Sequence, residues 1–188
     1  MLEQQPGRRA PGQDTLSFEV LRRTSILQQV ALDCINGILT GEAIPPRSWL
    51  GVLVSILLKK EAFFDTGGYR QMCLLNTVYK CLSAIVTDSL YRLAERHCLL
   101  DPSQEGFRRL HSTVQQVQTL QSLHWAVQEA AERREQLFCV YLDLRNAFNS
   151  IDHQALWQWL KELNIPDVDL LQSLYSGAYY KADMPYGR

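Results

Sequence analysis

The residue with the clearest chemical potential is Asp143, which directly follows the near-continuous apolar run Leu137–Leu142. Such a run is typical of a strand that is covered on both faces. A carboxylate at the carboxyl end of a buried strand projects into the crevice where open sheets bind ligands, and its oxygens suit Mg2+. An Asp after a strand is also a common turn former or helix cap, so this position alone leaves both interpretations open.

Three cations form a second candidate site: Lys59, Lys60 and Arg70. The apolar stretch Trp49–Leu58 precedes the lysines, turn-forming residues follow them, and the short extended piece Tyr69–Leu74 carries the arginine. A β-hairpin would bring the three cations together. Lysine offers a phosphate group a point charge, and arginine offers it a bidentate fork. A solvated hairpin tip is the alternative interpretation.

The third candidate is the stretch from Gln104 to Arg108. Gly106 permits close approach of the backbone, Phe107 can stack on a base, and Arg108 can bind phosphate. No G-x-S-x-G motif and no P-loop occurs in the sequence, and no local signature supports a Ser/His/Asp triad.

The elements that must position these residues are mostly helical. Asp14 or Ser17 can cap a helix that runs to about Leu39, and Pro45-Pro46 lies beyond its end. Trp49–Leu58 is predicted to be a strand and to pair with Tyr69–Leu74 as a hairpin.

Five further elements are predicted after the hairpin. A long helix capped by Asn76 runs to about Arg96, and a second runs from about Ser112 to Arg134. Leu137–Leu142 is predicted to be a strand. Two shorter helices follow: Asp152 caps the first and Asp167 opens the second. No element is predicted in the tail, residues 176–188.

Composition narrows the class of protein. The chain has 188 residues, of which 46% are hydrophobic, so it can bury a core. Its net charge of −1 argues against a globally basic nucleic-acid binder but leaves room for a local basic site. Five cysteines without C-x-x-C spacing disfavour disulfides and zinc knuckles. Without a signal peptide or a membrane-spanning run, an intracellular location, nucleus or cytoplasm, is expected.

Six motifs occur in a fixed order. They are A-P-G-Q-D at 10–14, I-P-P-R-S-W at 44–49, K-K at 59–60, Y-R-Q-M-C-L-L-N-T-V-Y-K at 69–80, Q-E-G-F-R at 104–108 with H-S at 111–112, and D-L-R-N-A-F-N-S-I at 143–151. In this order they resemble the reverse transcriptase domain of non-LTR (LINE-like) retrotransposons, over almost the whole chain. The last motif resembles palm motif A of that family.

The resemblance implies an α+β fold, rich in helices, that forms the fingers and part of the palm of a right-hand polymerase. Residues 1–13 would be a flexible arm, residues 14–135 the fingers with connecting helices, and residues 136–188 a partial palm. The complete enzyme would act on an RNA template, a DNA primer and deoxynucleoside triphosphates (dNTPs). Two Mg2+ ions would be its cofactors.

The resemblance also implies roles for single residues. Asp143 would be the first catalytic carboxylate and a ligand of both metal ions, and Leu144 would offer its backbone carbonyl to one of them. Phe148 would lie under the sugar of the incoming nucleotide. The triphosphate would be gripped by Arg70, Lys60 and Lys59. Weaker contacts to the template would come from Gln104, Gly106, Phe107 and Arg108.

The sequence departs from the family pattern in three places. Gln71, Met72 and Cys73 replace Pro, Ile and Ser, so the fixed φ of a proline is lost beside Arg70. Asn149 replaces the second Asp of motif A. The Gly-rich motif and the A-D-D motif, which supplies the remaining catalytic carboxylates, do not occur. The chain is therefore expected to be an N-terminal fragment that is inactive in isolation, without a membrane or disulfide partner.

Three alternatives stay open at this point. A chain with the same fold could be a non-catalytic remnant that binds nucleic acid or a partner. It could instead be a fragment similar to a group II intron maturase, although the Y-R-x-x-x-L-L-N and Q-x-G-F-R forms favour the non-LTR family. In the third alternative the chain is a helical interaction protein, and the motif matches are accidental.

Overall fold

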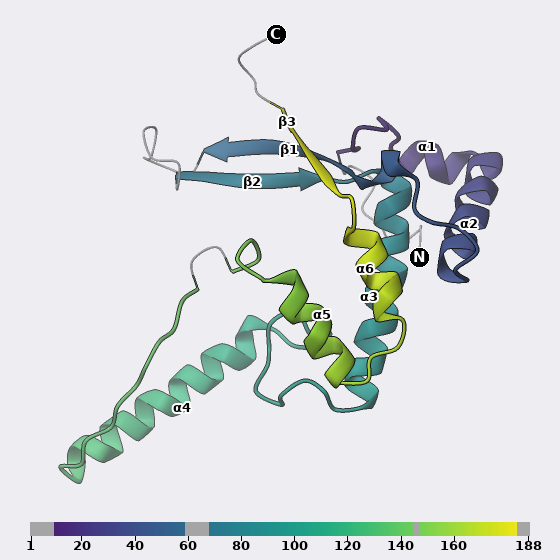
Figure 1. The fold of residues 1–188 in the computed structure, drawn as a ribbon. Coiled ribbons are helices and arrows are strands. Elements are labelled where there is room, and N and C mark those ends of the chain that lie inside the picture. Colours follow the sequence, from purple (N-terminus) through teal and green to yellow (C-terminus); the bar gives the residue numbers. More distant parts are fainter. Residues whose placement is uncertain (1–9, 59–67, 145–146, 184–188) are drawn as a thin grey trace. The chain divides into compact units, whose positions relative to one another are not determined.

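The computed structural model describes residues 10–58, 68–144 and 147–183, which fall into two compact units. The first unit comprises the described part of residues 1–88 and 152–188, and the second comprises the described part of residues 89–151. Helix α3 (Thr77–Arg96) begins in the first unit and ends in the second. Figure 1 labels the elements of both units.

Two helices open the first unit: α1 (Phe18–Arg23) and α2 (Ser25–Leu39). Ser17 caps α1 as predicted, because its side chain accepts a hydrogen bond from the backbone N–H of Val20 at 3.3 Å. The single helix predicted here is wrong, since Thr24 separates the two helices with extended backbone angles, φ −118° and ψ 98°. A β-branched residue adopts that conformation readily.

A three-stranded sheet follows the helices. The 3-10 turn η2 (Arg47–Leu50) leads into β1 (Gly51–Leu58), which pairs with β2 (Tyr69–Leu74) in antiparallel register. This confirms the predicted hairpin. Three of the first four residues of β1 are buried, and its last two residues are exposed.

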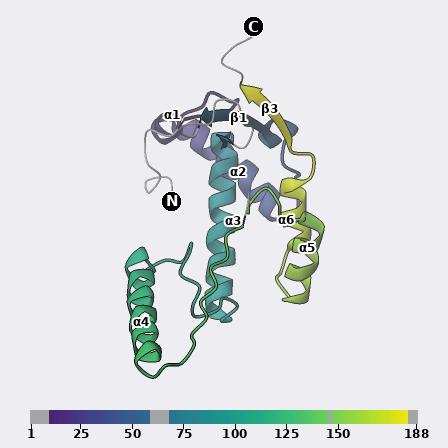
Figure 2. The same ribbon diagram turned by 90° about the vertical axis from the view of Figure 1, so that its left-hand side faces the viewer.

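The third strand, β3 (Tyr179–Asp183), lies in the tail where no element was predicted. It pairs in parallel with β1, on the side opposite β2, so that the strand order is β2-β1-β3. Both views draw β3 beside β1 (Figures 1 and 2). Local sequence did not reveal this strand because its partner, β1, lies more than a hundred residues earlier in the chain.

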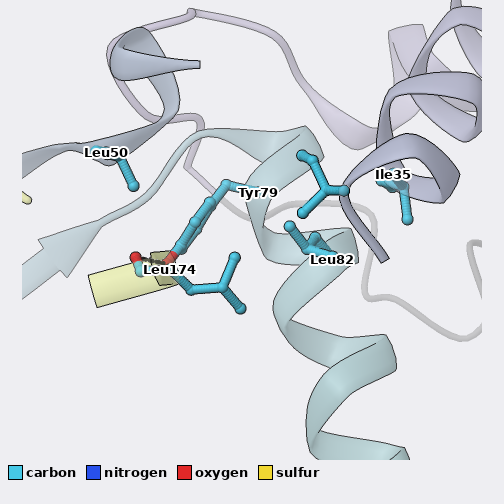
Figure 3. Packing of buried hydrophobic residues seen from close by; sticks show 6 residues of the cluster. Ile35, Leu50, Tyr79, Leu82 and Leu174 are labelled. Atoms are coloured by element: carbon cyan, nitrogen blue, oxygen red, sulfur yellow. Dashed lines mark hydrogen bonds between the residues drawn. The ribbon is translucent and has the colours of Figure 1, made fainter. Parts of the chain in front are cut away.

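The core of the first unit forms where helices and sheet meet. Its buried cluster draws on α2, α3, α6 (Val168–Tyr175) and the end of η2. The members are Ile35, Ile38, Leu50, Tyr79, Leu82 and Leu174. Figure 3 shows the ring of Tyr79 among these aliphatic side chains. The Tyr79 hydroxyl donates a 2.7 Å hydrogen bond to the carbonyl oxygen of Leu174, and burial raises the pKa of Tyr79 to about 12.

Helix α5 (His153–Glu162) precedes α6 and is capped as predicted. The carboxylate of Asp152 accepts hydrogen bonds from the backbone N–H groups of Gln154 and Ala155 at 2.7 and 3.2 Å. Asp167 opens α6 as predicted, but it has left-handed backbone angles and makes no side-chain capping bond. An ion pair of 3.0 Å joins Lys161 of α5 to Asp169 of α6.

The second unit contains the end of α3, a loop, and α4 (Thr113–Glu132). Ser112 and Gln115 form a reciprocal capping box at the start of α4, which confirms the predicted helix. No residue of α4 is buried. The apolar residues of this helix therefore face solvent within the part of the chain that the structure describes.

The predicted strand over Leu137–Leu142 is wrong. These residues have no regular secondary structure, and all of them are exposed. A strand needs a neighbour that satisfies its backbone N–H and C=O groups. The described part of residues 89–151 offers no strand that could supply one.

The predicted α+β class is confirmed at this level, since the described residues combine helices with a three-stranded sheet. All five cysteines are free thiols. Within residues 10–58, 68–144 and 147–183, no helix has the length and apolar character that crossing a membrane requires.

Candidate functional site

The hairpin places Arg70 near the start of β2, opposite Leu57 of β1. Arg70 is exposed there. Residues two apart on a strand share a face, so Arg70 lies on the same face of β2 as Met72, and Gln71 lies on the other face. The other two predicted cations, Lys59 and Lys60, lie outside the described residues.

The segment that contains the A-P-G-Q-D motif holds the junction between β2 and α3. The carboxylate of Asp14 accepts a 2.8 Å hydrogen bond from the backbone N–H of Thr77, and the hydroxyl of Thr77 donates one of 2.5 Å to the carbonyl of Leu16. Gly12 packs so closely here that a Cβ atom would lie 2.6 Å from backbone atoms of Leu75 and Asn76. Gly12 of the predicted arm therefore packs against this junction, and the carbonyl of Ala10 accepts a 2.8 Å hydrogen bond from the ammonium group of Lys80.

Asn76 holds the position before α3, and its carbonyl accepts the 2.9 Å bond from the N–H of Lys80. Its buried side chain links three segments. The amide nitrogen donates a 2.7 Å bond to the carbonyl of Ser48, and the amide oxygen accepts a 3.3 Å bond from the N–H of Asp14. The carboxylate that caps α3 thus comes from Asp14, which lies 63 residues before Thr77, the residue whose N–H it caps. The sequence did not predict this cap.

The loop from Gln104 to Arg108 lies in the second unit and is held by Arg108. The guanidinium group makes two hydrogen bonds of 2.9 Å to the carboxylate of Glu95 on α3. It also donates to the carbonyl oxygens of Asp101 and Gln104 at 3.2 and 3.3 Å. Its side chain is only 13% exposed. Arg108 therefore acts as a clamp that closes the loop onto α3, a role the sequence did not reveal because Glu95 belongs to no motif.

Electrostatics support this clamp. The hydrogen bond from Arg108 lowers the pKa of Glu95 and raises that of Arg108, so both groups favour their charged forms. Beyond the clamp, Nδ1 of His111 lies 2.6 Å from Oε2 of Glu105. The loop is thus tied at its middle and at its end, directly before the capping box of α4.

Two predicted site residues meet in the second unit. The ring of Phe107 lies in an edge-to-face contact with the ring of Phe148, with centroids 5.9 Å apart and an interplanar angle of 82°. This is a favourable aromatic geometry. Both rings are otherwise exposed. The structure therefore joins the Q-E-G-F-R loop to the motif that begins at Asp143.

Asp143 and Leu144 lie in the exposed, irregular segment before that contact. The carboxylate oxygens of Asp143 suit Mg2+ chemically. In the described ranges, no three His, Cys, Asp or Glu side chains gather in a way that could hold a metal ion. Asp143 thus offers one ligand, and a single carboxylate does not bind Mg2+ tightly.

The predicted site residues are divided between the two units. Arg70 belongs to the first unit, whereas Gln104, Gly106, Phe107, Arg108, Asp143, Leu144 and Phe148 belong to the second. Within the second unit, the structure brings together the loop at Phe107 and the segment at Phe148.

A cavity of about 1030 Å³ in the first unit is lined by none of the predicted site residues. Its walls come from α5 and from the end of α6 with Ser176. Trp157 and Tyr175 pack ring against ring beside it with centroids 5.5 Å apart, and the ring of His153 lies 5.6 Å from that of Tyr175. The spacing of His153 and Trp157, four residues apart on a helix, was the only local signal for this aromatic cluster.

Comparison with known proteins gives a family. Residues 57–188 match the family described as reverse transcriptase (RNA-dependent DNA polymerase). The probable RNA-directed DNA polymerase from transposon X-element of Drosophila melanogaster is 26% identical over 184 residues, which cover 94% of this chain and 19% of that protein.

Two further relatives give the same picture. The RNA-directed DNA polymerase from mobile element jockey of Drosophila funebris is 27% identical over 172 residues, 90% of this chain and 18% of that protein. The retrovirus-related Pol polyprotein from type-1 retrotransposable element R2 of Popillia japonica is 24% identical over 159 residues, 84% of this chain and 20% of that protein. The chain thus spans about a fifth of the length of these relatives.

Because the family match covers most of the chain, the chain belongs to the reverse transcriptase family. Its relatives include polymerases of retrotransposons without long terminal repeats. The resemblance drawn from the six ordered motifs is confirmed.

Proposed function

We propose that the chain contributes nucleotide-gripping and metal-binding residues to an RNA-directed DNA polymerase of a non-LTR retroelement. The observation that carries this proposal is the family match over residues 57–188, which includes β2 with Arg70 and the motif at Asp143. In this proposal, residues 14–135 belong to the fingers and residues 136–188 to the palm. The substrates are an RNA template, a DNA primer and dNTPs, in the nucleus or cytoplasm.

Arg70 is the residue we assign to the triphosphate. Transfer of a phosphoryl group depends on positioning and on neutralising charge more than on covalent chemistry by the protein. A guanidinium group supplies both, because it is always charged and presents a rigid fork of donors. Two features support this assignment: β2, which carries the fork, is paired with β1, and Asn76 and Asp14 hold the junction that follows β2. Lys59 and Lys60 would add point charges.

Asp143 is assigned as a ligand of Mg2+, with the carbonyl of Leu144 beside it. When bound, two Mg2+ ions would neutralise charge on the attacking and leaving oxygens. Asp143 is exposed and therefore accessible to a metal-bound triphosphate. Phe148 is assigned to the space under the sugar, where an aromatic ring would exclude a 2′-hydroxyl.

Contacts to the template are assigned to the loop from Gln104 to Arg108. Phe107 is 91% exposed, so its ring offers surface for a base to stack on in addition to its contact with Phe148. Gly106 leaves the backbone accessible. The guanidinium of Arg108 is already bonded to Glu95, so we expect Arg108 and Gln104 to shape the loop rather than to supply its main phosphate contact.

The test measures triphosphate and template binding separately on the 188-residue chain. We expect Arg70→Ala to weaken binding of a fluorescent, non-hydrolysable dNTP with Mg2+ by at least about 10-fold, since a charge-assisted contact contributes roughly 1.5–3 kcal/mol. Binding of an RNA–DNA hybrid should change little. Gln71→Ala is the matched control, because Gln71 is the exposed neighbour on the other face of β2. Equal losses for nucleotide and hybrid would contradict the assignment.

Primer extension gives a second, independent test. We expect the 188-residue chain to bind nucleic acid weakly but not to extend a primer on an RNA template, because its described residues supply only Asp143 as a candidate metal ligand. Extension that disappears in Asp143→Ala would contradict this expectation and establish a complete active site. Hybrid binding without any nucleotide binding would favour a non-catalytic nucleic-acid-binding remnant.

A further inference from the structure

The starting observation is the backbone at Phe107. This residue has φ +64°, a left-handed conformation that is uncommon for a bulky side chain. The residue is nevertheless 91% exposed. Strained conformations of this kind persist only where the surroundings enforce them, and they concentrate at functional sites.

Contacts of the next two residues, Arg108 and Arg109, hold Phe107 in this conformation. Arg108 binds Glu95 through two hydrogen bonds and also bonds to the carbonyls of Asp101 and Gln104. The backbone N–H of Arg109 donates a 3.2 Å bond to the hydroxyl of Tyr91, and the Arg109 guanidinium lies 4.7 Å from the centre of the Tyr91 ring. The loop is therefore anchored to α3 at two successive positions beside Phe107.

The anchored loop presents the ring of Phe107, against which Phe148 packs. Among the described residues, Phe148 makes its ring contact with Phe107, edge to face and with centroids 5.9 Å apart. Leu110 is a control for the backbone conformation of Phe107. It follows in the same connection between α3 and α4 with the same φ of +64°, and it is 99% exposed.

We propose that Phe107 is a positioning residue that holds the ring of Phe148 and thereby sets how strongly the chain prefers deoxyribonucleotides to ribonucleotides. This rests on the proposed function, in which Phe148 lies under the sugar. A ring excludes a 2′-hydroxyl only if it cannot rotate away, and Phe148 lies in an exposed segment without regular structure. The anchored edge of Phe107 supplies the restraint that this segment lacks.

The size of the effect follows from the energy of the contact. An edge-to-face aromatic pair is favoured by an amount that corresponds to roughly a 2- to 10-fold change in an equilibrium. Loss of the Phe107 ring should therefore lower the ratio of deoxyribonucleotide to ribonucleotide affinity by that factor. Affinity for the deoxyribonucleotide itself should change less, because Phe107 does not touch the triphosphate in this proposal.

The experiment uses the 188-residue chain with Phe107→Leu, Phe107→Tyr and Leu110→Ala. One readout is the NMR spectrum of the Phe148 ring in protein with 13C-labelled phenylalanine, assigned with Phe148→Leu. The other is the ratio of affinities for dTTP and its ribose counterpart with Mg2+. We expect Phe107→Leu to shift the Phe148 resonances and to lower the ratio, whereas Phe107→Tyr, which keeps the ring, and Leu110→Ala should do neither.

Two results would overturn the proposal: Phe148 resonances that do not respond to Phe107→Leu, or a ratio that Leu110→Ala lowers as much as Phe107→Leu. A shifted ring with an unchanged ratio would overturn the selectivity role while keeping the contact. If the unmodified chain binds neither nucleotide, the proposed function fails and the selectivity role fails with it. The ring spectrum then still decides, on its own, whether Phe107 holds Phe148.

Discussion

The two units contain apolar residues in abundance but use them differently. Every buried hydrophobic residue among the described residues lies in the first unit, where helices, turn and sheet converge from distant parts of the chain. The second unit has no buried residue in its described part, although α4 has a correct cap and an apolar stripe. Local sequence sets where a helix begins and ends, but burial requires a partner surface, and packing against such a surface supplies most of a helix's stability.

The two units also hold their candidate functional residues in different ways. In the first unit, Arg70 stands on a strand that is paired along its length, and Asn76 and Asp14 hold the junction that follows it. In the second unit, Phe107 and Phe148 stand on irregular segments, and polar bonds to α3 together with one ring contact hold them. Packing should therefore dominate the energetics of the first unit, and electrostatics those of the second.

The largest predicted effect tests whether the core lies in the first unit. Leu82 is 0% exposed, so Leu82→Ala should lower the free energy of unfolding by about 2–5 kcal/mol through lost burial and a cavity. Leu120→Ala is the matched control in α4, where the same side chain is 52% exposed, and it should cost no more than about 0.5 kcal/mol. Urea unfolding monitored by circular dichroism measures both. Equal losses would show that α4 is packed in solution.

The second prediction concerns the junction between β2 and α3. Gly12→Ala should destabilise the first unit by about 1–3 kcal/mol, because its Cβ would lie 2.6 Å from backbone atoms that cannot move aside. Gly37→Ala is the control, since Gly37 lies inside α2 and a Cβ atom there would lie 3.5 Å from the Cβ of Ala43, an ordinary contact distance. Alanine there should be neutral or stabilise the helix. The same urea titration measures both, and a neutral Gly12→Ala would show that residues 10–13 do not pack against α3.

Prediction from sequence succeeded where the signal was local. Ser17 and Asp152 identified helix starts correctly, and the start of α4 was predicted near Ser112. Apolar composition and turn residues identified the β1–β2 hairpin. These signals act within a few residues, so no knowledge of the fold is needed to interpret them.

Prediction failed where the signal was distant. The strand β3 and the Asp14 cap both depend on partners far away in sequence. For Leu137–Leu142, the apolar composition of a buried strand was present, but a neighbouring strand was not found among the described residues. The candidate site shows the same limit: the motifs named Phe107 and Phe148 separately, whereas their contact and the Glu95–Arg108 clamp emerged only from the structure.

The third prediction probes the polar bond inside the first unit's core. Tyr79→Phe leaves the carbonyl of Leu174 without its hydrogen bond and should cost about 1–2 kcal/mol. Alkaline pH should act on the same hydroxyl group. Because folding raises the pKa of Tyr79 from its usual value of 10.0 to about 12, the contribution of the neutral hydroxyl to stability is complete below pH 10. It is lost as the pH rises towards 12. Urea midpoints between pH 8 and 11.5 should fall less steeply in Tyr79→Phe, and parallel curves would contradict the prediction.

The smallest predicted effect belongs to the clamp of the second unit. The hydrogen bond from Arg108 lowers the pKa of Glu95 in the folded chain. The clamp is therefore intact above the ordinary pKa of a glutamate, and it is lost as the pH falls through the lower folded-state pKa. A 13C NMR titration of the Glu95 carboxyl group should show this depressed pKa. Arg108→Gln should return it towards its ordinary value while the unfolding midpoint of the first unit stays unchanged. If Arg108→Gln left the pKa of Glu95 unchanged, the clamp would not form in solution. If Arg108→Gln lowered the unfolding midpoint of the first unit, the clamp would stabilise the core in addition to holding the loop at Phe107.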